Sequence, residues 1–535
     1  MEYSDRAEIS VRGNTSFYFT KKPYRLELQN EDGEDKKVSL LGMPAESDWI
    51  LYPSFTDKTF ARNVLAHELW RRMGYYAVRW RFVEVFVVTN EPPRMHTNGH
   101  ESLDALGSAG APVVEGAARP QPGSLPKERV KLEAPLMRGV ELQDWLNRWH
   151  ATQSVAAAVS WPSVYHPLTA LFPDSYQGVY VLLEKPKRGK HRVNVKRLKP
   201  EDDAEPEITG GYIIKQDRLD PNERGTMTGQ EFRVTYVDPK EEELTPAQKQ
   251  WMAKYLDDFE KALFGLNFRD PVNGYAKYID ADSFIDYHWM VEVGKNADGY
   301  AVSQYMHKDR GGKLKMGPLW DWDSTFGNSF IKNGYRTNGW RFEYMPDPDY
   351  TWYRRLFEDP DFLQRYVDRW SELRTNVFAT SNMLALVDSI VGQLKEAEAR
   401  NFQRWPILGS VVPDGPIGDT YQDEVHWLKQ WITGRLAWID SQDFPKPEAE
   451  RFVENSEIKL RLSTKTGRIF YTVDGADPRR PGGSMSSTAL EYRGPIILAR
   501  NVQVFARVRS DFNLWSAPVV IDPPSRNEPR PANFH

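Results

Sequence analysis

Residues 313–328 read KLKMGPLWDWDSTFGN, and this stretch carries the strongest chemical signal in the chain. The pattern predicts a strand from Lys313 to Asp323 that ends in Trp320-Asp321-Trp322-Asp323. Because side chains alternate along a strand, both tryptophans would face one way and both carboxylates the other, about 7 Å apart. Two hard oxygen ligands on one face suit Mg²⁺ or Mn²⁺ on a nucleotide. They suit the acid and base of a sugar-cleaving enzyme nearly as well, and an exposed strand edge with solvated aspartates gives the same pattern.

A further carboxylate, Asp298, lies upstream of this segment. A helix is expected from Asp282 to Val293, and Asp298 follows it in a loop before a hairpin that contains Ser303. An Asp-Gly pair is commonly no more than a turn. However, a loop carboxylate followed 23 residues later by strand-end carboxylates is typical of the catalytic-loop and metal-binding aspartates of protein kinases.

Basic residues near the N-terminus could bind phosphates. Lys21, Lys22 and Arg25 follow the polar turn at residues 12–16 and lead into a predicted strand, Tyr24 to Leu28. These side chains could cover phosphates, and they could equally form the solvated tip of a hairpin.

Two later segments could complete a nucleotide site. Glu68 lies on a helix expected from Asp57 to Met73 and could pair with a phosphate-binding lysine, although a surface salt bridge is equally compatible with its position. Glu184 and Lys185 leave a strand at the point where the hinge of a kinase would offer its backbone to an adenine.

Composition excludes several classes of function. The chain has 535 residues, a formal net charge of −5 and no cysteine. The acidic balance argues against nucleic acid as a partner. The lack of cysteine excludes disulfides, thiolate zinc sites and a cysteine nucleophile. The sequence has no transmembrane segment, because no run of eighteen apolar residues occurs. The length favours two or three domains.

Composition and secondary-structure signals divide the chain into four parts. Residues 1–90 and 175–200 are rich in strand signals, and the strands Phe82 to Val88 and Gly178 to Leu183 are expected to be antiparallel neighbours. Residues 91–174 form an insertion that is expected to be largely irregular. Residues 201–445 are expected to be mainly helical, and residues 450–522 to form a small β-sandwich. The expected helices are Trp251 to Phe264, Asp282 to Val293, Tyr353 to Val377, Met383 to Phe402 and Asp423 to Asp440.

A series of motifs resembles the CotH (spore-coat protein H) family of kinase-like proteins, and they occur in family order across residues 7 to 440. The motifs are Arg12-Gly13-Asn14, Lys21-Lys22-Pro23-Tyr24-Arg25, Leu40-Leu41-Gly42-Met43-Pro44, Ser47-Asp48-Trp49, Asp57-Lys58-Thr59, Arg62-Asn63, Glu84-Val85, Gln177-Gly178-Val179-Tyr180, Glu184-Lys185, Gly210-Gly211-Tyr212, Asn296-Ala297-Asp298, Trp320-Asp321-Trp322-Asp323 and Phe326-Gly327-Asn328.

The resemblance implies an α+β, atypical two-lobed protein-kinase-like fold that uses ATP and Mg²⁺ or Mn²⁺ to phosphorylate protein serines or threonines. It implies Asp298 as the catalytic acid and Asp321 with Asp323 as metal ligands. Ser303 stands where kinases have a metal-binding Asn and would be a weaker ligand. The implied partner is a protein with serine-rich segments, on spore coats in the best-known members.

The C-terminal segment resembles the small chitobiase or β-hexosaminidase C-terminal-type module, through Tyr471-Thr472-Val473-Asp474-Gly475, Asp477-Pro478, Gly494-Pro495-Ile496 and Val504-Phe505-Ala506-Arg507. This module would pack or attach to a surface, with carbohydrate contact as one option, and would carry no catalysis. We expect an extracytoplasmic or cell-surface location if a signal sequence precedes this chain, and a cytoplasmic one otherwise.

Three functional classes therefore follow from the sequence. The first is a CotH-like protein serine kinase. The second is a catalytically degenerate kinase-fold binding or surface protein, which the Ser303 substitution and the appended β-sandwich favour. The third is a glycan-active enzyme, supported by paired carboxylates and a high aromatic content. Metal-dependent nucleotide binding separates the first class from the third, and turnover separates the first from the second.

Overall fold

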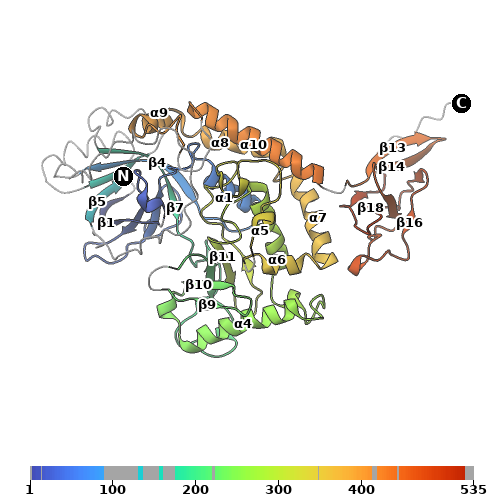
Figure 1. Cartoon of the computed structure of the whole chain (residues 1–535), viewed down its shortest axis with the longest axis horizontal. Helices are drawn as coiled ribbons and strands as arrows, with labels where there is room; N and C mark the ends of the chain where they lie inside the picture. The colour runs from blue at the N-terminus through green and yellow to red at the C-terminus, as the bar shows by residue number, and fades with distance from the viewer. Residues whose placement is uncertain are drawn as a thin grey trace, which may run out of the picture. The chain divides into compact units, whose positions relative to one another are not determined.

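The chain forms two compact units with mixed helix and sheet content, and the second unit ends in all-β sheets at the C-terminus (Figure 1). This computed structural model describes residues 3–13, 15–88, 130–136, 156–160, 175–219, 223–346, 349–411, 418–442 and 445–524. The first unit contains residues 1–55, 79–185 and 393–407. The second contains residues 56–78, 186–392 and 408–535.

A closed barrel forms the first unit, with the strand order β1-β2-β3-β7-β4-β6-β5. Its core contains alternate residues of the strands, among them Leu26, Trp49 and Tyr180, because one face of each strand points inward. Helix α9 (Lys395–Arg404) packs on β7. The strands are β1 (Tyr3–Val11), β2 (Tyr24–Leu28), β3 (Asp48–Tyr52), β4 (Trp80–Val88), β5 (Val130–Leu136), β6 (Ala156–Ser160) and β7 (Tyr176–Glu184).

The expected pairing of the two strands that flank the insertion is confirmed. Strands β4 and β7 are antiparallel neighbours, with Phe82 opposite Val181 and Glu84 opposite Val179. The insertion, expected to be largely irregular, contributes two strands to the barrel, since β5 pairs with β1 and β6 pairs with β4. Residues 91–129, 137–155 and 161–174 of the insertion lie outside the described residues.

The second unit combines a five-stranded sheet, in the order β12-β11-β8-β10-β9, with helices. The strands are β8 (Tyr212–Gln216), β9 (Thr226–Met227), β10 (Arg233–Asp238), β11 (Gln304–Lys308) and β12 (Lys315–Met316). The helices are α1 (Arg62–Arg72), α4 (Pro246–Phe264), α5 (Ala281–Gly294), α6 (Thr351–Leu356), α7 (Pro360–Thr375), α8 (Thr380–Val391) and α10 (Tyr421–Gln442). The sequence indicated only the β11–β12 hairpin of this sheet.

Two of the expected helices are each divided in two. The helix expected from Tyr353 to Val377 is interrupted because Asp359 caps a new helix whose first residue is Pro360, and proline lacks the N–H that a continuous helix needs. The helix expected from Met383 to Phe402 is interrupted at Gly392, and its second half, α9, belongs to the first unit. The helix expected from Asp57 begins later, at Arg62.

Helix α5 is the buried element that presents Asp298. Nearly every residue of it is buried, and its polar side chains are therefore paired. Asp286 accepts from Arg369 Nε at 2.7 Å, and the two ring nitrogens of His288 meet Tyr366 Oη at 2.8 Å and Tyr350 Oη at 2.6 Å. These pairs fix the helix, so the loop that follows it begins from a rigid point.

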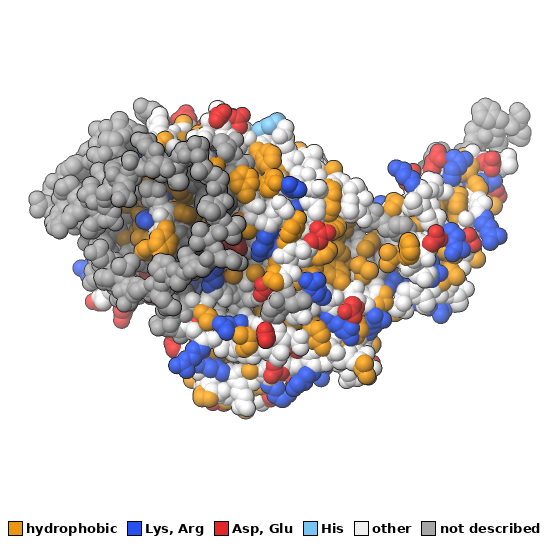
Figure 2. Space-filling view, viewed as in Figure 1, with side chains coloured by type: hydrophobic (Ala, Val, Ile, Leu, Met, Phe, Trp, Pro, Cys, Tyr) orange, Lys and Arg blue, Asp and Glu red, His pale blue; other side chains and the backbone are white. Residues whose placement is uncertain are grey.

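The C-terminal module consists of a three-stranded and a four-stranded sheet over one core that includes Leu460, Val504 and Val508. Its strands are β13 (Glu448–Glu454), β14 (Glu457–Ser463), β15 (Arg468–Thr472), β16 (Leu490–Glu491), β17 (Ile496–Ile497), β18 (Val504–Arg509) and β19 (Val519–Ile521). In the space-filling view of Figure 2, charged side chains of both signs are interspersed with hydrophobic ones over the described part of the visible face.

Candidate active site

The segment that contains the two aspartates is not the strand that alternation predicted. Strand β12 ends at Met316, because Gly317 has a φ of 98° and Pro318 has no N–H to donate to a sheet. Asp321 has a φ of 62° and is exposed. The prediction that the two carboxylates share a strand face is therefore wrong.

The same segment is held by residues from the start of the second unit. Asp323 Oδ2 accepts a hydrogen bond from Thr56 Oγ1 at 2.7 Å, and Asn63 Oδ1 accepts from the backbone N–H of Trp322 at 3.2 Å. Asn328 donates through Nδ2 to Thr56 O at 3.0 Å and to Asp323 O at 2.9 Å. Two motifs that lie far apart in the sequence therefore form one polar cluster.

The loop that carries Asp298 lies against helix α5. Tyr287 Oη donates to Gly299 O at 2.7 Å, and Asn296 Oδ1 accepts from the N–H of Asp298 at 2.9 Å. A Cβ at Gly299 would lie 2.7 Å from Val291 Cγ1, so only glycine allows this close approach. The position of Asp298 is thus fixed by its neighbours on both sides.

Burial and nearby charges perturb the pKa of Asp298. Burial raises the pKa of Asp298, and the charge of Asp323 raises it further. Lys332, Arg218 and Arg341 oppose that increase in pKa. The pKa of Asp298 is thus set by burial and by charges of both signs, a perturbation that is common for groups that transfer protons.

Sequence reasoning missed the two cations closest to this loop. Arg341 Nη2 donates to Ala297 O at 2.6 Å, and Lys332 Nζ donates to the same oxygen at 3.3 Å. Burial lowers the pKa of Lys332, and so does the charge of Arg341. Asp349 interacts with both cations, and burial raises its pKa. No motif marked these residues, because isolated charged residues in loops carry no periodic signal.

The site offers oxygen ligands for a hard divalent cation. Asp323 supplies a carboxylate, and Asn328 keeps its amide oxygen as an acceptor because its N–H groups bind two carbonyls. Within the described ranges, no group of three or more His, Asp or Glu side chains is placed to hold a metal ion. This donor set fits Mg²⁺, which commonly binds one or two carboxylates and completes its shell with water and substrate phosphates.

Two further predicted metal ligands lie near this segment in sequence. Ser303 is half-buried and has a φ of 56°, in the turn that precedes β11. The metal-binding roles of Asp321 and Ser303 stay predictions.

The predicted phosphate-binding basic residues all lie in the first unit. Lys21 is 1% exposed, and its ammonium group donates to Pro53 O at 2.8 Å, to Asn401 Oδ1 at 2.9 Å and to Val179 O. An ammonium group has three N–H donors, so these acceptors occupy all of them. Lys22 donates to Phe17 O at 2.7 Å. The geometry of Lys21 therefore favours a structural role.

The remaining predicted residues make local ion pairs. Arg25 pairs with Asp48 at 2.8 Å and with Glu27 at 2.9 Å. Glu68, in the second unit, pairs with Arg71 one turn along α1.

Glu184 is fully buried and accepts from the backbone N–H of Arg79 at 2.9 Å and from its guanidinium at 3.0 Å. The backbone N–H of Glu184 donates to Arg79 O at 3.0 Å, so it is not available to an adenine. Lys185 follows β7 and is half-buried.

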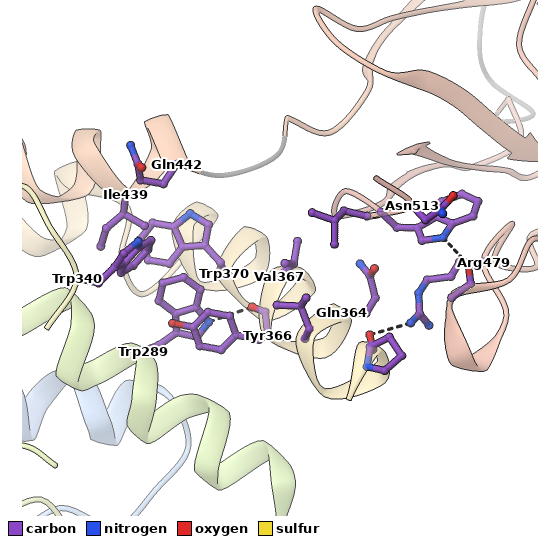
Figure 3. Close-up of a pocket in the computed structure, with 15 residues that line it drawn as sticks. Trp289, Trp340, Gln364, Tyr366, Val367, Trp370, Ile439, Gln442, Arg479 and Asn513 are labelled. Carbon is purple, nitrogen blue, oxygen red and sulfur yellow. Dashed lines mark hydrogen bonds between the residues drawn. The ribbon is translucent and has the colours of Figure 1, made fainter. Parts of the chain in front are cut away.

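A separate cavity of about 270 Å³ lies in the second unit, between α7 and the C-terminal module (Figure 3). Its lining includes Trp289, Tyr366, Trp370 and Trp515 and none of the predicted site residues. The ring faces of Trp289 are stacked on Tyr366 at 4.0 Å and on Trp370 at 4.5 Å, so they are not available as a platform for a sugar.

Comparison with protein families identifies the family of the chain. The model described as CotH kinase protein matches residues 9–91 and 160–439, which cover most of the chain. The matched ranges include Asp298 and the polar cluster of Thr56, Asn63, Asp323 and Asn328. The chain belongs to the CotH family. The CotH match resumes at residue 160, within the last part of the expected insertion, and runs through Asp298 and Asp323.

The C-terminal segment of this CotH protein matches a different model from the one that the sequence suggested. Residues 458–518 match the model described as Fn3 associated, and the chitobiase-type resemblance is not confirmed. No curated protein matches the chain. Within the described part of the chain, none of the helices combines the length and the apolar character needed to cross a membrane.

Proposed function

We propose that this CotH protein is a protein kinase that transfers the γ-phosphate of ATP to serine or threonine hydroxyls of a protein. The observation that carries the proposal is the loop of Asp298, where Lys332 and Arg341 both donate to Ala297 O and where the charge of Asp323 adds to burial in raising the pKa of Asp298. CotH family membership supports the same chemistry. The kinase-like fold predicted from the sequence is part of this proposal.

Asp298 is the group that receives the proton of the acceptor hydroxyl. A bond forms between that oxygen and the γ-phosphorus, the bond from phosphorus to the bridging oxygen of ADP breaks, and the hydroxyl proton passes to Asp298. The raised pKa of Asp298 makes it a better proton acceptor than an ordinary aspartate. Arg341 keeps the loop in place by binding Asn296 O at 2.8 Å and Ala297 O at 2.6 Å.

Asp323 and Asn328 would hold Mg²⁺ or Mn²⁺, with Asp321 as a further carboxylate on the same segment. Bound there, the ion would neutralise phosphate charge. Thr56 orients Asp323 through its hydroxyl, and Asn63 holds the backbone of Trp322.

The proposed substrate is a protein with serine-rich segments. We further propose that the Fn3-associated module attaches the enzyme to a surface, which a carbohydrate-binding assay tests. The proposed location is extracytoplasmic or at the cell surface if a signal sequence precedes this chain, and cytoplasmic otherwise.

The test is transfer of label from γ-labelled ATP, with Mg²⁺ or Mn²⁺, to the protein itself and to a serine-rich substrate. Transfer should require the metal and should fall by about 10²- to 10⁴-fold in Asp298→Asn, which removes the proton acceptor. Asp388→Asn is the matched control, because Asp388 is an exposed residue of α8 whose ion-pair partner is Lys429 of α10.

Two outcomes would contradict the proposal. Metal-dependent nucleotide binding without any transfer by the parent protein would favour the non-catalytic alternative. Equal transfer by the parent and by Asp298→Asn would remove Asp298 from the mechanism.

A further inference from the structure

Two cationic side chains meet at the backbone carbonyl that precedes Asp298. Arg341 Nη2 and Lys332 Nζ both donate to Ala297 O, at 2.6 Å and 3.3 Å. Both cations also interact electrostatically with Asp298 and Asp349. Positive charge is therefore concentrated beside the carboxylate that would accept the hydroxyl proton.

The two cations differ in what they can still bind. Arg341 is fully buried, and its planar guanidinium is fixed to the carbonyls of Asn296 and Ala297. Such a group positions the loop. Lys332 is half-exposed on a short 3₁₀ turn, Ile331–Asn333, so its ammonium group lies between the buried loop and solvent. Of the two, Lys332 is the cation that an incoming ligand can reach.

The backbone that presents Lys332 is strained and tightly held. Lys332 has a φ of 52° and Asn333 a φ of 55°, a conformation that residues other than glycine rarely adopt. Lys295 Nζ donates to Asn333 O at 3.1 Å, to Arg336 O at 3.2 Å and to Asn338 O at 2.5 Å. A buried lysine thus fixes the turn in a costly conformation, which is a feature that clusters at functional sites.

We propose that Lys332 binds the phosphoryl group that is transferred, an assignment that rests on the proposed kinase activity. In the loose transition state of phosphoryl transfer, negative charge spreads over the equatorial oxygens of the γ-phosphoryl group. The ammonium group of Lys332 neutralises that charge and keeps its own protons, while the hydroxyl proton passes to Asp298. Lys295 is a positioning residue that holds the turn.

The competing explanation is that Lys332 is only a counter-ion of Asp298. The two roles differ in their effect on ligands that differ by one phosphate. A γ-phosphate ligand contributes to the affinity for ATP and not to the affinity for ADP, whereas a counter-ion acts on both nucleotides in the same way.

The experiment is calorimetric titration of the full chain, in Mg²⁺, with ADP and with a non-hydrolysable ATP analogue. The variants are Lys332→Gln, which removes the charge, and Lys332→Arg, which retains it. Gln and Arg both carry a Cβ, as Lys does, so neither replacement removes or adds backbone strain at this positive φ. Lys313→Gln is the control, because Lys313 is an exposed lysine of the β11–β12 hairpin.

We expect Lys332→Gln to bind ADP as the parent does and to lose about tenfold in affinity for the ATP analogue, the size of one charge-assisted hydrogen bond. Lys332→Arg should retain most of the preference for the analogue, and Lys313→Gln all of it. An unchanged preference in Lys332→Gln, or an equal loss for both ligands, would overturn the inference. If the parent binds neither nucleotide, the proposed kinase function itself fails, and that outcome is distinguishable because it does not depend on the variant.

Discussion

The carboxylate of Glu292 joins the end of α5 to the candidate site and offers the sharpest test of what holds Asp298 in place. Glu292 is fully buried and accepts from Tyr300 Oη at 2.9 Å, from Arg341 N at 2.7 Å and from Phe342 N at 3.0 Å. Arg435, also fully buried, lies with Nη2 at 3.4 Å from Oε2. Glu292→Gln keeps the shape of the side chain, removes its charge and places an N–H donor where the carboxylate accepted.

The magnitude follows from the burial of the pair. Burial raises the pKa of Glu292, and burial lowers the pKa of Arg435 to about 10, so each charge is costly to keep inside the protein. Removing one partner of a buried pair costs about 3 to 5 kcal/mol. We expect about 3 kcal/mol, because Arg435 keeps hydrogen bonds to the carbonyls of Thr337 and Gly339. In a unit of several hundred residues, this lowers the melting temperature by about 4 to 6 °C.

Calorimetric unfolding checks this prediction, read on the transition of the second unit because a multidomain chain can melt in steps. Glu358→Gln is the control, since Glu358 is an exposed i,i+3 partner of Arg355 and surface pairs contribute about 0 to 1 kcal/mol. The double variant Glu292→Gln/Arg435→Met should lose less than the sum of the two single losses, because neither charge is then left alone. A Glu292→Gln protein that melts like the parent, or additive losses in the double variant, would refute the reasoning.

Three further predictions concern other groups. The pKa of Asp298 is raised and proton acceptance needs the ionised carboxylate, so the rate of transfer should rise with pH through a value above the ordinary aspartate range. Because the folded state binds this proton more tightly than the unfolded state, protonation of Asp298 stabilises the fold, and the loss of activity at acid pH should not come from unfolding caused by this group. A pH–rate profile measured with melting curves at the same pH values checks both statements. Asp323→Asn should weaken metal-dependent nucleotide binding as well as transfer, measured by the thermal shift with nucleotide and Mg²⁺, and an unchanged shift would contradict a ligand role. Lys21→Met should destabilise the first unit by about 1 to 3 kcal/mol, because it removes the buried donor to Pro53 O and Val179 O, while Asn401 Oδ1 still accepts from the N–H of Val179. Lys22→Met should change stability little, and loss of nucleotide affinity in folded Lys21→Met would instead support the phosphate role.

Local sequence signals predicted much of the fold. Periodicity located α4, α5 and α10, and the strand signals on either side of the insertion located β4 and β7, which are neighbours. The wrong boundaries of helices and strands have local physical causes that the periodicity of apolar residues does not reveal. Pro360 and Gly392 break helices whose apolar periodicity continues across them, and Pro318 ends a strand whose alternation continues to Asp323.

The sequence predicted the residues of the candidate site that stand in motifs and missed the residues that do not. Asp298 and Asp323 stand within motifs, and the structure couples their charges. Lys332, Arg341 and Asp349 have no motif and reach the site only through tertiary contacts. A basic residue next to a strand suggests a phosphate ligand, but the sequence cannot reveal that buried carbonyls already occupy the ammonium group, as they do at Lys21.

The charge environment of Asp298 differs from that of the other buried carboxylates described above. In the barrel, Glu84 accepts from Arg400 Nε and Nη2, each at 2.8 Å, and Glu184 accepts from Arg79, so these carboxylates are neutralised by arginines within the unit. In the second unit, Glu292 forms the same kind of buried pair with Arg435, at 3.4 Å, whereas at Asp298 the like charge of Asp323 adds to the effect of burial in raising the pKa. A protein that only needed stability would pair Asp298 as it pairs Glu84, since an unfavourable charge environment costs folding free energy. Under the proposed kinase function, this cost is explained by the need for a carboxylate that accepts a proton. The strained turn at Lys332 has the same explanation under the proposed phosphate role, because strained backbone clusters at functional sites.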